Sequence, residues 1–234
     1  MQELSKRLFV VADMVEQGSV VADIGTDHAY IPIYLVQQGI CKKAIAMDVN
    51  KGPLERAKAH IAEHGLQEQI ATRLSDGLKQ LSEEEADTYV MAGMGGPLMV
   101  TILKNRMDLL QKGKTLVLQP QSEIWKVREF LIRNQYEIIQ EEMFLDMGKT
   151  YVAMKAVKSK EKVPSYTKAQ YIFGKLLLEH LNPELFRYLQ KQKKVYEDLV
   201  YKLNQSISEQ TKVRKAECEQ MLVYIDEALK YYEM

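Results

Sequence analysis

The sequence predicts an α/β fold, with an open and mostly parallel sheet followed by an α-helical domain. Three observations predict it. Between residues 20 and 134, apolar β-type runs alternate with helix-like segments, which is typical of a parallel sheet with helices on both faces. Two further β-type runs then follow each other without a helix between them. Beyond residue 160, apolar residues recur at helical spacing.

The alternating part accounts for five strands and four helices. We expect the strands at Val20–Ile24, Ala44–Met47, Ile70–Leu74, Thr88–Met91 and Thr115–Leu118. We expect the helices at Ile31–Gln38, Pro53–His64, Pro97–Asn105 and Glu123–Asn134. Two of these helices begin at a proline, a residue that is tolerated in a first helical turn. The segment therefore predicts a parallel sheet covered by helices.

The sheet is expected to end in an antiparallel hairpin. The runs Tyr136–Leu145 and Thr150–Val157 are joined by the turn Asp146-Met147-Gly148-Lys149. The next segment, Lys158–Pro164, is rich in lysine and glutamate and ends in proline, as linkers often do. We therefore divide the chain into a sheet domain at residues 1–160 and a helical domain at residues 161–234.

The second domain is expected to be a coiled-coil-like pair of antiparallel helices. Asn182-Pro183-Glu184 resembles a helix start. Apolar residues within 196–207, the last of them Ile207, and within 213–225 lie three or four apart with charged residues between them. Two basic stretches, Lys191–Lys194 and Lys212–Lys215, either contact phosphates or only keep helix faces solvated.

Composition excludes a membrane-spanning helix and favours a cytoplasmic protein, which we expect to be a monomer. The 234 residues are 46% hydrophobic and 27% charged, and no run of about 18 apolar residues occurs. The N-terminal residues lack the apolar core of a signal peptide. Cys41 and Cys218 lie far apart and make no disulfide framework. A net charge of zero permits a nucleic-acid partner without demanding one.

Acidic and glycine-containing loops follow four strands whose carboxyl ends should be neighbours, where such sheets bind ligands. The candidate cofactor-binding residues in these loops are Asp23, Gly25, Asp27, Asp48, Asn50, Asp76, Gly77, Ala92, Gly93 and Met94. Asp48 can accept hydrogen bonds from ribose hydroxyls, and Asp76 can accept one from an adenine amino group. Glycines on either side of Met94 let the backbone approach a ligand closely.

The loop after the first strand lacks the glycine pattern of a dinucleotide site. Asp27 and Tyr30 occupy the second and third glycine positions of G-x-G-x-x-G. Three carboxylates, Asp23, Asp27 and Asp48, would repel a pyrophosphate. They suit a cofactor with a positive centre and an amino group, and S-adenosylmethionine is such a cofactor.

A metal site is not expected. His60 and His64 stand one helical turn apart, a spacing that can bind a metal ion. The sequence offers no third ligand near them, and a solvated helix face explains the pair more simply.

The chain resembles the class I S-adenosylmethionine-dependent methyltransferases, and more closely the bacterial TrmK family. The motifs that carry the resemblance are Leu4–Leu8, Ala22–Pro32, Ser75–Leu78, Ala92–Gly96 and Leu116–Pro120. The resemblance covers roughly the first 155 residues, and the helical tail matches the family in character only. One departure is Asp48, where the family often has Glu. The resemblance implies a Rossmann-like methyltransferase sheet and S-adenosylmethionine as cofactor.

The resemblance also implies a reaction, methylation of N1 of adenine 22 in tRNA. Adenine N1 lies on the pairing edge, so a base in a stem must leave the stack before it reacts. A site for this reaction should align N1 with the methyl group and supply negative potential near the ring. No Asn-Pro-Pro-aromatic motif follows the fourth strand, which favours a ring nitrogen over an exocyclic amine.

Asp27, His28 and Tyr30 are the candidate catalytic residues, because they follow the cofactor loop directly. His28 is either catalytic or a satisfied loop histidine, and Tyr30 either stacks on a base or packs under the helix. Gln119 either binds the target base or caps the fifth strand, and Arg7 is a candidate for contact with the cofactor carboxylate or RNA.

Two alternative functions stay open at this point. One is a methyltransferase of the same fold that acts on another RNA or on a small molecule. The other is a helical interaction protein that binds the cofactor without turnover.

Overall fold

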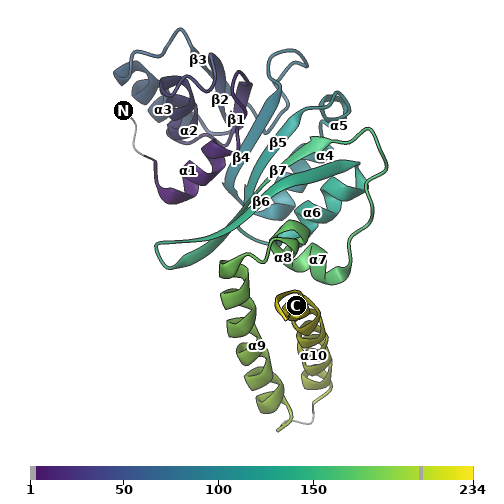
Figure 1. Cartoon of the computed structure of the whole chain (residues 1–234). Helices are drawn as coiled ribbons and strands as arrows, with labels where there is room; N and C mark the ends of the chain where they lie inside the picture. Colours follow the sequence, from purple (N-terminus) through teal and green to yellow (C-terminus); the bar gives the residue numbers. More distant parts are fainter. Residues whose placement is uncertain (1–3, 206–207, 234) are drawn as a thin grey trace. The chain divides into compact units, whose positions relative to one another are not determined.

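The computed structural model describes residues 4–205 and 208–233. The chain forms two compact units, residues 1–165 and 166–234 (Figure 1). The boundary expected from the sequence, at residue 160, falls five residues earlier, and both positions lie in a segment without regular structure that runs from residue 159 to residue 167.

The first unit is built on one seven-stranded sheet with the strand order β3-β2-β1-β4-β5-β7-β6. Its strands are β1 (Val20–Ile24), β2 (Lys43–Asp48), β3 (Ile70–Leu74), β4 (Thr88–Met94), β5 (Thr115–Pro120), β6 (Tyr136–Asp146) and β7 (Lys149–Lys158). Strands β1 to β5 are parallel, and β7 pairs antiparallel with both β5 and β6. The α/β sheet with a closing antiparallel hairpin is therefore confirmed.

The chain winds outward from β1 through β2 to β3 and then returns to the other side of β1 with β4 and β5. Ala22 of β1 pairs with Ile45 of β2 on one side and with Tyr89 of β4 on the other. The order of the strands thus reverses between β1 and β4, and the carboxyl ends of these strands border the crevice in which open α/β sheets bind ligands.

Two groups of helices accompany the sheet (Figure 1). The first group is α1 (Lys6–Asp13), α2 (Tyr30–Gln37) and α3 (Lys51–Glu63), and the second is α4 (Gly96–Lys104), α5 (Met107–Leu110) and α6 (Ile124–Arg133). Helix α1 was not expected from the sequence. Its start is set by Ser5, whose side chain accepts a hydrogen bond from the amide of Leu8. In α4, Pro97 lies in the first turn as expected.

The strands are longer than the sequence patterns suggested where a partner strand continues the pairing. Strand β4 extends to Met94, because Ala92 pairs with Gln119 and Met94 pairs with Pro120 across a bulge. The hairpin turn is confined to Met147 and Gly148, whose φ values are 45° and 79°. Two positive φ values are the geometry that two-residue hairpin turns require.

The interior of the sheet unit contains one buried ion pair beside the apolar core. Arg128 of α6 and Glu141 of β6 are joined by an Nε–Oε1 contact of 2.7 Å, and both side chains are 1% exposed. Their pairing fixes α6 on β6, because a buried charge is stable only when it is paired.

The second unit is entirely helical in its described part. Its helices are α7 (Lys168–Phe173), α8 (Lys175–Glu179), α9 (Pro183–Leu203), α10 (Glu209–Leu229) and the 3-10 turn Lys230–Tyr232. Asn182 caps α9 as the sequence predicted, and Ser208 caps α10. The hydroxyl of Tyr232 donates to the carbonyl of Asn182, which brings the end of α10 back to the start of α9.

Helices α9 and α10 therefore form the expected antiparallel pair (Figure 1). A coiled-coil geometry for this pair stays a prediction. Among the described residues, no helix is both long enough and apolar enough to span a membrane.

Candidate active site

A cavity of about 570 Å³ opens at the carboxyl ends of β1 and β4. Most of its lining residues come from three segments. They are the start of α1 with Arg7, the loop after β1 from Asp23 to Ile31, and the end of β4 with Ala92 and Gly93. Its volume lies in the range of small-molecule sites, and its position is the reversal point of the strand order.

The loop after β1 is tightly held and has an unusual backbone. The amides of Gly25 and Thr26 both donate to the carbonyl of Met47, at 2.8 Å and 3.0 Å. Gly25, Asp27 and Ala29 have φ values of 78°, 49° and 56°. For non-glycine residues this left-handed conformation costs about 1–2 kcal/mol each. Such strain persists where the surroundings impose it, typically at functional sites.

Asp23 is an internal brace of this loop. Its side chain is buried, and the hydroxyl of Thr26 donates to its Oδ2 at 2.6 Å. The pKa of Asp23 is raised to about 7. Burial of the carboxyl group is the main cause, the charge of Asp48 adds to the rise, and the hydrogen bond from Thr26 opposes it. Asp23 thus joins the end of β1 to the turn that leads to α2.

The three candidate catalytic residues lie together at the rim of the cavity. Asp27 and Tyr30 line the cavity, and His28 lies directly beside them. The Nη2 atom of Arg56 donates to Oδ1 of Asp27 at 2.8 Å, and Nε2 of His28 is 3.8 Å from the same oxygen. The rings of His28 and Tyr30 are stacked, with centroids 5.2 Å apart. A carboxylate, an imidazole and a phenol ring therefore meet at one rim.

The candidates after β2 and β3 extend the same sheet edge but do not line the cavity. Oδ1 of Asp48 accepts the amide hydrogen of Asn50 at 2.8 Å, and among the described residues nothing donates to the other oxygen. Asp76 is exposed and pairs with Lys79 at 2.6 Å. A Cβ atom on Gly77 would lie 2.7 Å from Ile102, so the glycine at this position has a packing reason.

The end of β4 is tied to α1 through Gln119. The amide of Gly93 and the Nη1 atom of Arg7 both donate to Oε1 of Gln119, at 3.1 Å and 3.0 Å. Gln119 is fully buried, so it positions its neighbours. Gly93 has a φ of 88°, and a Cβ atom there would approach Arg7 to 3.4 Å. Met94 packs on Gly25, since its Cε atom would be 3.0 Å from a Cβ atom there.

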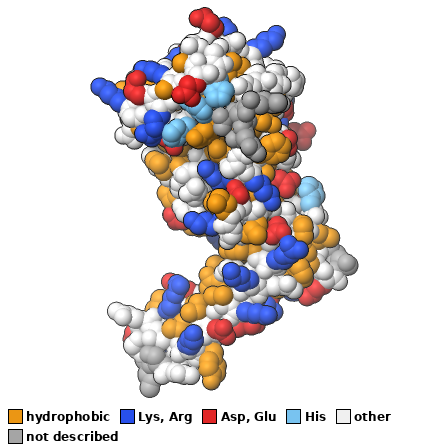
Figure 2. Space-filling model, turned by 90° about the vertical axis from the view of Figure 1, so that its left-hand side faces the viewer, with side chains coloured by type: hydrophobic (Ala, Val, Ile, Leu, Met, Phe, Trp, Pro, Cys, Tyr) orange, Lys and Arg blue, Asp and Glu red, His pale blue; other side chains and the backbone are white. Residues whose placement is uncertain are grey.

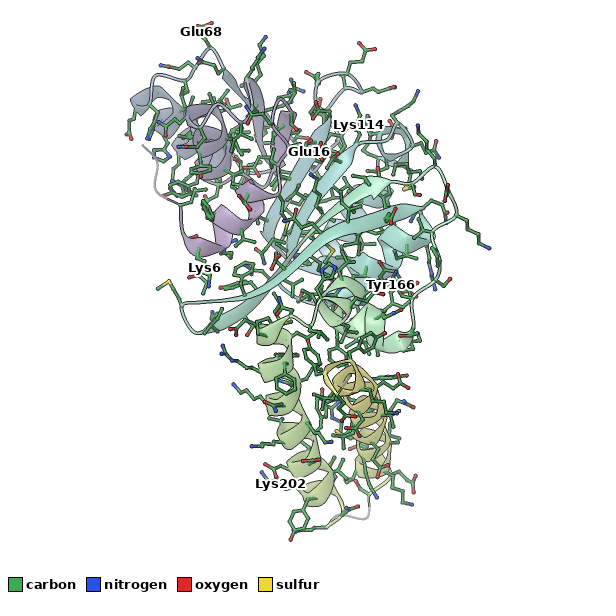
Figure 3. The ribbon with its side chains drawn as sticks, viewed as in Figure 1. Lys6, Glu16, Glu68, Lys114, Tyr166 and Lys202 are labelled. Carbon is green, nitrogen blue, oxygen red and sulfur yellow. The ribbon has the colours of Figure 1, made fainter. Side chains whose placement is uncertain are left out.

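Sequence reasoning gave little weight to the start of α1, which forms one wall of the cavity. The hairpin holds this wall in place, because the amide of Arg7 donates to Oδ2 of Asp146 at 3.0 Å. Lys6, labelled in Figure 3, donates from Nζ to the carbonyl of Leu145 at 3.0 Å. The signal for α1 was Ser5 ahead of an amphipathic run. Gln121 also lines the cavity, and no pattern in the sequence pointed to it.

The described residues contain no group of three or more His, Cys, Asp or Glu side chains arranged to hold a metal ion. The expectation of a metal-free site stays a prediction.

Comparison with known proteins identifies the family. Residues 4–154 match the family model described as a methyltransferase domain. A tRNA (adenine(22)-N(1))-methyltransferase of Bacillus subtilis is 40% identical over 154 residues, which are 66% of this chain and 65% of that protein. The crystal structure of the B. subtilis m1A22 tRNA methyltransferase TrmK has a TM-score of 0.90 at 30% identity, covering 98% of this chain and 100% of that one. This chain belongs to the TrmK family of methyltransferases.

A second TrmK structure matches along nearly the whole chain. TrmK of M. capricolum, in complex with the cofactor product S-adenosylhomocysteine, has a TM-score of 0.85 at 28% identity. The match covers 97% of this chain and 98% of that chain. The resemblance seen in the sequence is thus confirmed. The TrmK likeness also includes the helical unit, which the sequence motifs did not reach.

Proposed function

We propose that this chain transfers a methyl group from S-adenosylmethionine to N1 of adenine 22 in tRNA. The observation that carries the proposal is the cavity itself. It lies at the strand reversal of a TrmK-family sheet, and residues 23–30 supply both the buried Asp23 and the rim residues Asp27 and Tyr30. The Bacillus subtilis relative carries this activity in its name.

The residues along the sheet edge fit this cofactor. Asp48 has a carboxylate oxygen without a donor among the described residues, which suits ribose hydroxyls, and Asn50 lies next to it. Asp76 suits the adenine amino group, with Gly77 beside it. Gly25, Ala92 and Gly93 put little side-chain bulk between the backbone and the cavity. When bound, S-adenosylmethionine supplies an electrophilic methyl group on a positively charged sulfur.

The rim residues account for the nucleotide side of the reaction. The target base leaves its stack to expose N1, and the ring of Tyr30 offers it a surface in the cavity wall. Methylation at N1 places positive charge on the purine, and the carboxylate of Asp27 supplies negative potential at the rim. His28 accepts a proton from N6 at its Nε2 atom, which faces Asp27 at 3.8 Å.

We place tRNA phosphates on the helical unit, at Lys191–Lys194 and Lys212–Lys215. Figure 2 shows Lys and Arg side chains scattered among hydrophobic ones on the surface of this unit. Several are held by exposed ion pairs, such as Lys193 with Asp226 and Lys212 with Glu209. Exposed pairs of this kind are weak, and phosphates can replace the carboxylates. The enzyme is proposed to act in the cytoplasm as a monomer, without a metal.

The decisive experiment is methyl transfer from labelled S-adenosylmethionine to an unmodified tRNA transcript, followed by nucleoside analysis. We expect N1-methyladenosine with the natural transcript and none when guanine replaces adenine 22. Asp27→Ala should lower kcat by about 100-fold, the scale of one electrostatic contact in an active site. Methylation of the guanine-22 transcript, or no methylation of either, contradicts the proposal.

The role of the helical unit has its own test. Lys191→Glu combined with Lys194→Glu should weaken tRNA binding and flatten its salt dependence, because phosphate contacts release counterions. Lys42→Glu combined with Lys43→Glu makes the same charge change at the amino end of β2. Equal losses of tRNA affinity in both variants would show that the helical unit makes no specific contact with tRNA.

A further inference from the structure

Four aromatic rings run from the wall of the cavity onto the surface of α3. They belong to Tyr30, His28, His60 and His64. We infer that the outer part of this ring cluster is a stacking site for an unpaired nucleotide next to the methylated adenine. The inference rests on the proposed function and adds a contact outside the reacting base.

The rings are in continuous contact. Tyr30, which lines the cavity, stacks on His28 and meets His60 edge to face with centroids 5.1 Å apart. His60 in turn meets His64 edge to face at 4.8 Å. All four side chains are only partly exposed. The cluster is therefore rigid and still open to solvent at its edge, as a stacking surface must be.

Backbone carbonyls hold both outer imidazoles in place. Nδ1 of His60 lies 2.9 Å from the carbonyl oxygen of His28, and Nδ1 of His64 lies 2.8 Å from the carbonyl oxygen of His60. A carbonyl only accepts, so Nδ1 carries the hydrogen in both rings. This tautomer presents Nε2 as an acceptor, and no described residue donates to either Nε2.

Unpaired RNA matches these features better than the alternatives. Proteins read single-stranded RNA by stacking bases on aromatic and histidine rings, and they tell it from DNA by the 2′-hydroxyl. An outward-facing Nε2 acceptor suits that hydroxyl as a donor. Extrusion of the target adenine also leaves its neighbours without a stacking partner. Arg56 and Lys58 lie on the same helix. They form exposed pairs with Asp27 and Glu55, and such pairs are weak enough for a backbone phosphate to compete with the carboxylates.

The same two imidazoles do not make a convincing metal site. Their planes are nearly perpendicular, at 84°, and the described residues offer no third ligand. The cluster is also continuous with the cavity through Tyr30. Because the ring cluster starts in the cavity wall, it favours a ligand that extends out of the cavity, as a polynucleotide does.

His64→Ala in the 234-residue chain is the sharpest test, because His64 is the outermost ring of the cluster and, among the described residues, its side chain is hydrogen-bonded only to a carbonyl of its own helix. Loss of one stacked base should raise the Kd for an unmodified tRNA transcript about tenfold. The KM for tRNA should rise likewise, with kcat and S-adenosylmethionine affinity unchanged. His64→Phe keeps a ring and should retain most of the affinity.

Gln67→Ala is the matched control, since Gln67 is a neutral, exposed residue just beyond α3. It should bind tRNA like the wild type. Unchanged tRNA affinity in His64→Ala overturns the stacking site, and so does an equal loss in His64→Phe and His64→Ala. If the wild type methylates adenine 22 but these variants show no effect, only the stacking site fails. If the wild type methylates no tRNA, the proposed function fails first.

Discussion

Both units have ion pairs at the surface, but among the described residues only the sheet unit also buries charged side chains. In the sheet unit, Asp23, Arg128, Glu141 and Lys155 are all buried. In the helical unit, the ion pairs are exposed and mostly join residues one helical turn apart, such as Arg187 with Glu184. Buried charges demand one arrangement, because an unpaired one is costly. Exposed pairs exchange partners at little cost.

This difference matches two tasks, the positioning of the cavity's parts in the sheet unit and the proposed binding of tRNA by the helical unit. The sheet unit uses polar groups to fix the loop after β1, to tie α1 to the hairpin and to hold α6 on β6. The helical unit keeps its charges adjustable, which suits contact with a phosphate backbone whose position varies. Four predictions test this comparison, in order of decreasing effect.

Breaking the buried pair should have the largest effect on stability. Arg128→Met removes the partner of Glu141, and Oε2 of that carboxylate already lacks a hydrogen-bond donor among the described residues. Loss of one member of a buried pair costs about 3–5 kcal/mol in the free energy of unfolding. Urea unfolding measures it. A cost below about 1 kcal/mol would mean that the pair behaves like a surface pair.

Asp23 should make stability depend on pH. Its pKa of about 7 in the folded chain exceeds the ordinary aspartate value of 3.8, so the folded state binds more protons than the unfolded state between about pH 4 and pH 7. Stability from this group is therefore lost as pH rises through that window, by roughly 4 kcal/mol at most.

Asp23→Asn removes this titration. The free energy of unfolding of this variant, relative to that of the wild type, should therefore be higher at pH 8 than at pH 5. Urea unfolding at both pH values measures the gain. Glu68→Gln, an exposed change labelled in Figure 3, is the control and should show the same difference at both pH values. A constant offset for Asp23→Asn would contradict the assigned pKa.

Asp48→Ala should weaken S-adenosylmethionine binding more than Asp76→Ala does. Asp48 is nearly buried and has an oxygen left for the ribose, whereas Asp76 is exposed and already paired with Lys79. Hydrogen bonds to a charged group are worth about 1.5–3 kcal/mol, which is roughly a 10- to 100-fold change in Kd. Calorimetric titration gives both values. A larger increase in Kd for Asp76→Ala would mean that the main cofactor contact lies after β3.

Lys193→Met should have the smallest effect on stability. It breaks the exposed pair with Asp226, and such pairs contribute less than about 1 kcal/mol. Its urea midpoint should stay close to that of the wild type. A loss of unfolding free energy as large as that of Arg128→Met would mean that the exposed pair contributes as much to stability as the buried one.

The fold could be predicted largely because its strands and helices carry local patterns. The run Val20–Ile24 was predicted with its observed ends. Helix α1 was missed, because eight residues with one capping serine are a weak signal. The ends of β4 and β5 were misplaced, because pairing with a neighbouring strand extends them and no local pattern shows it.

The sequence alone determined the order of strands and helices, the loops that carry the candidate residues and the resemblance to the TrmK family. These are local properties, set by periodicity, caps and short motifs. Only the tertiary structure decided that Gln119 is a buried brace and that Arg7 forms a wall of the cavity. It also decided that His60 contacts the ring of Tyr30 and that His64 contacts His60. These roles depend on contacts between residues far apart in the chain, and no local pattern encodes such contacts.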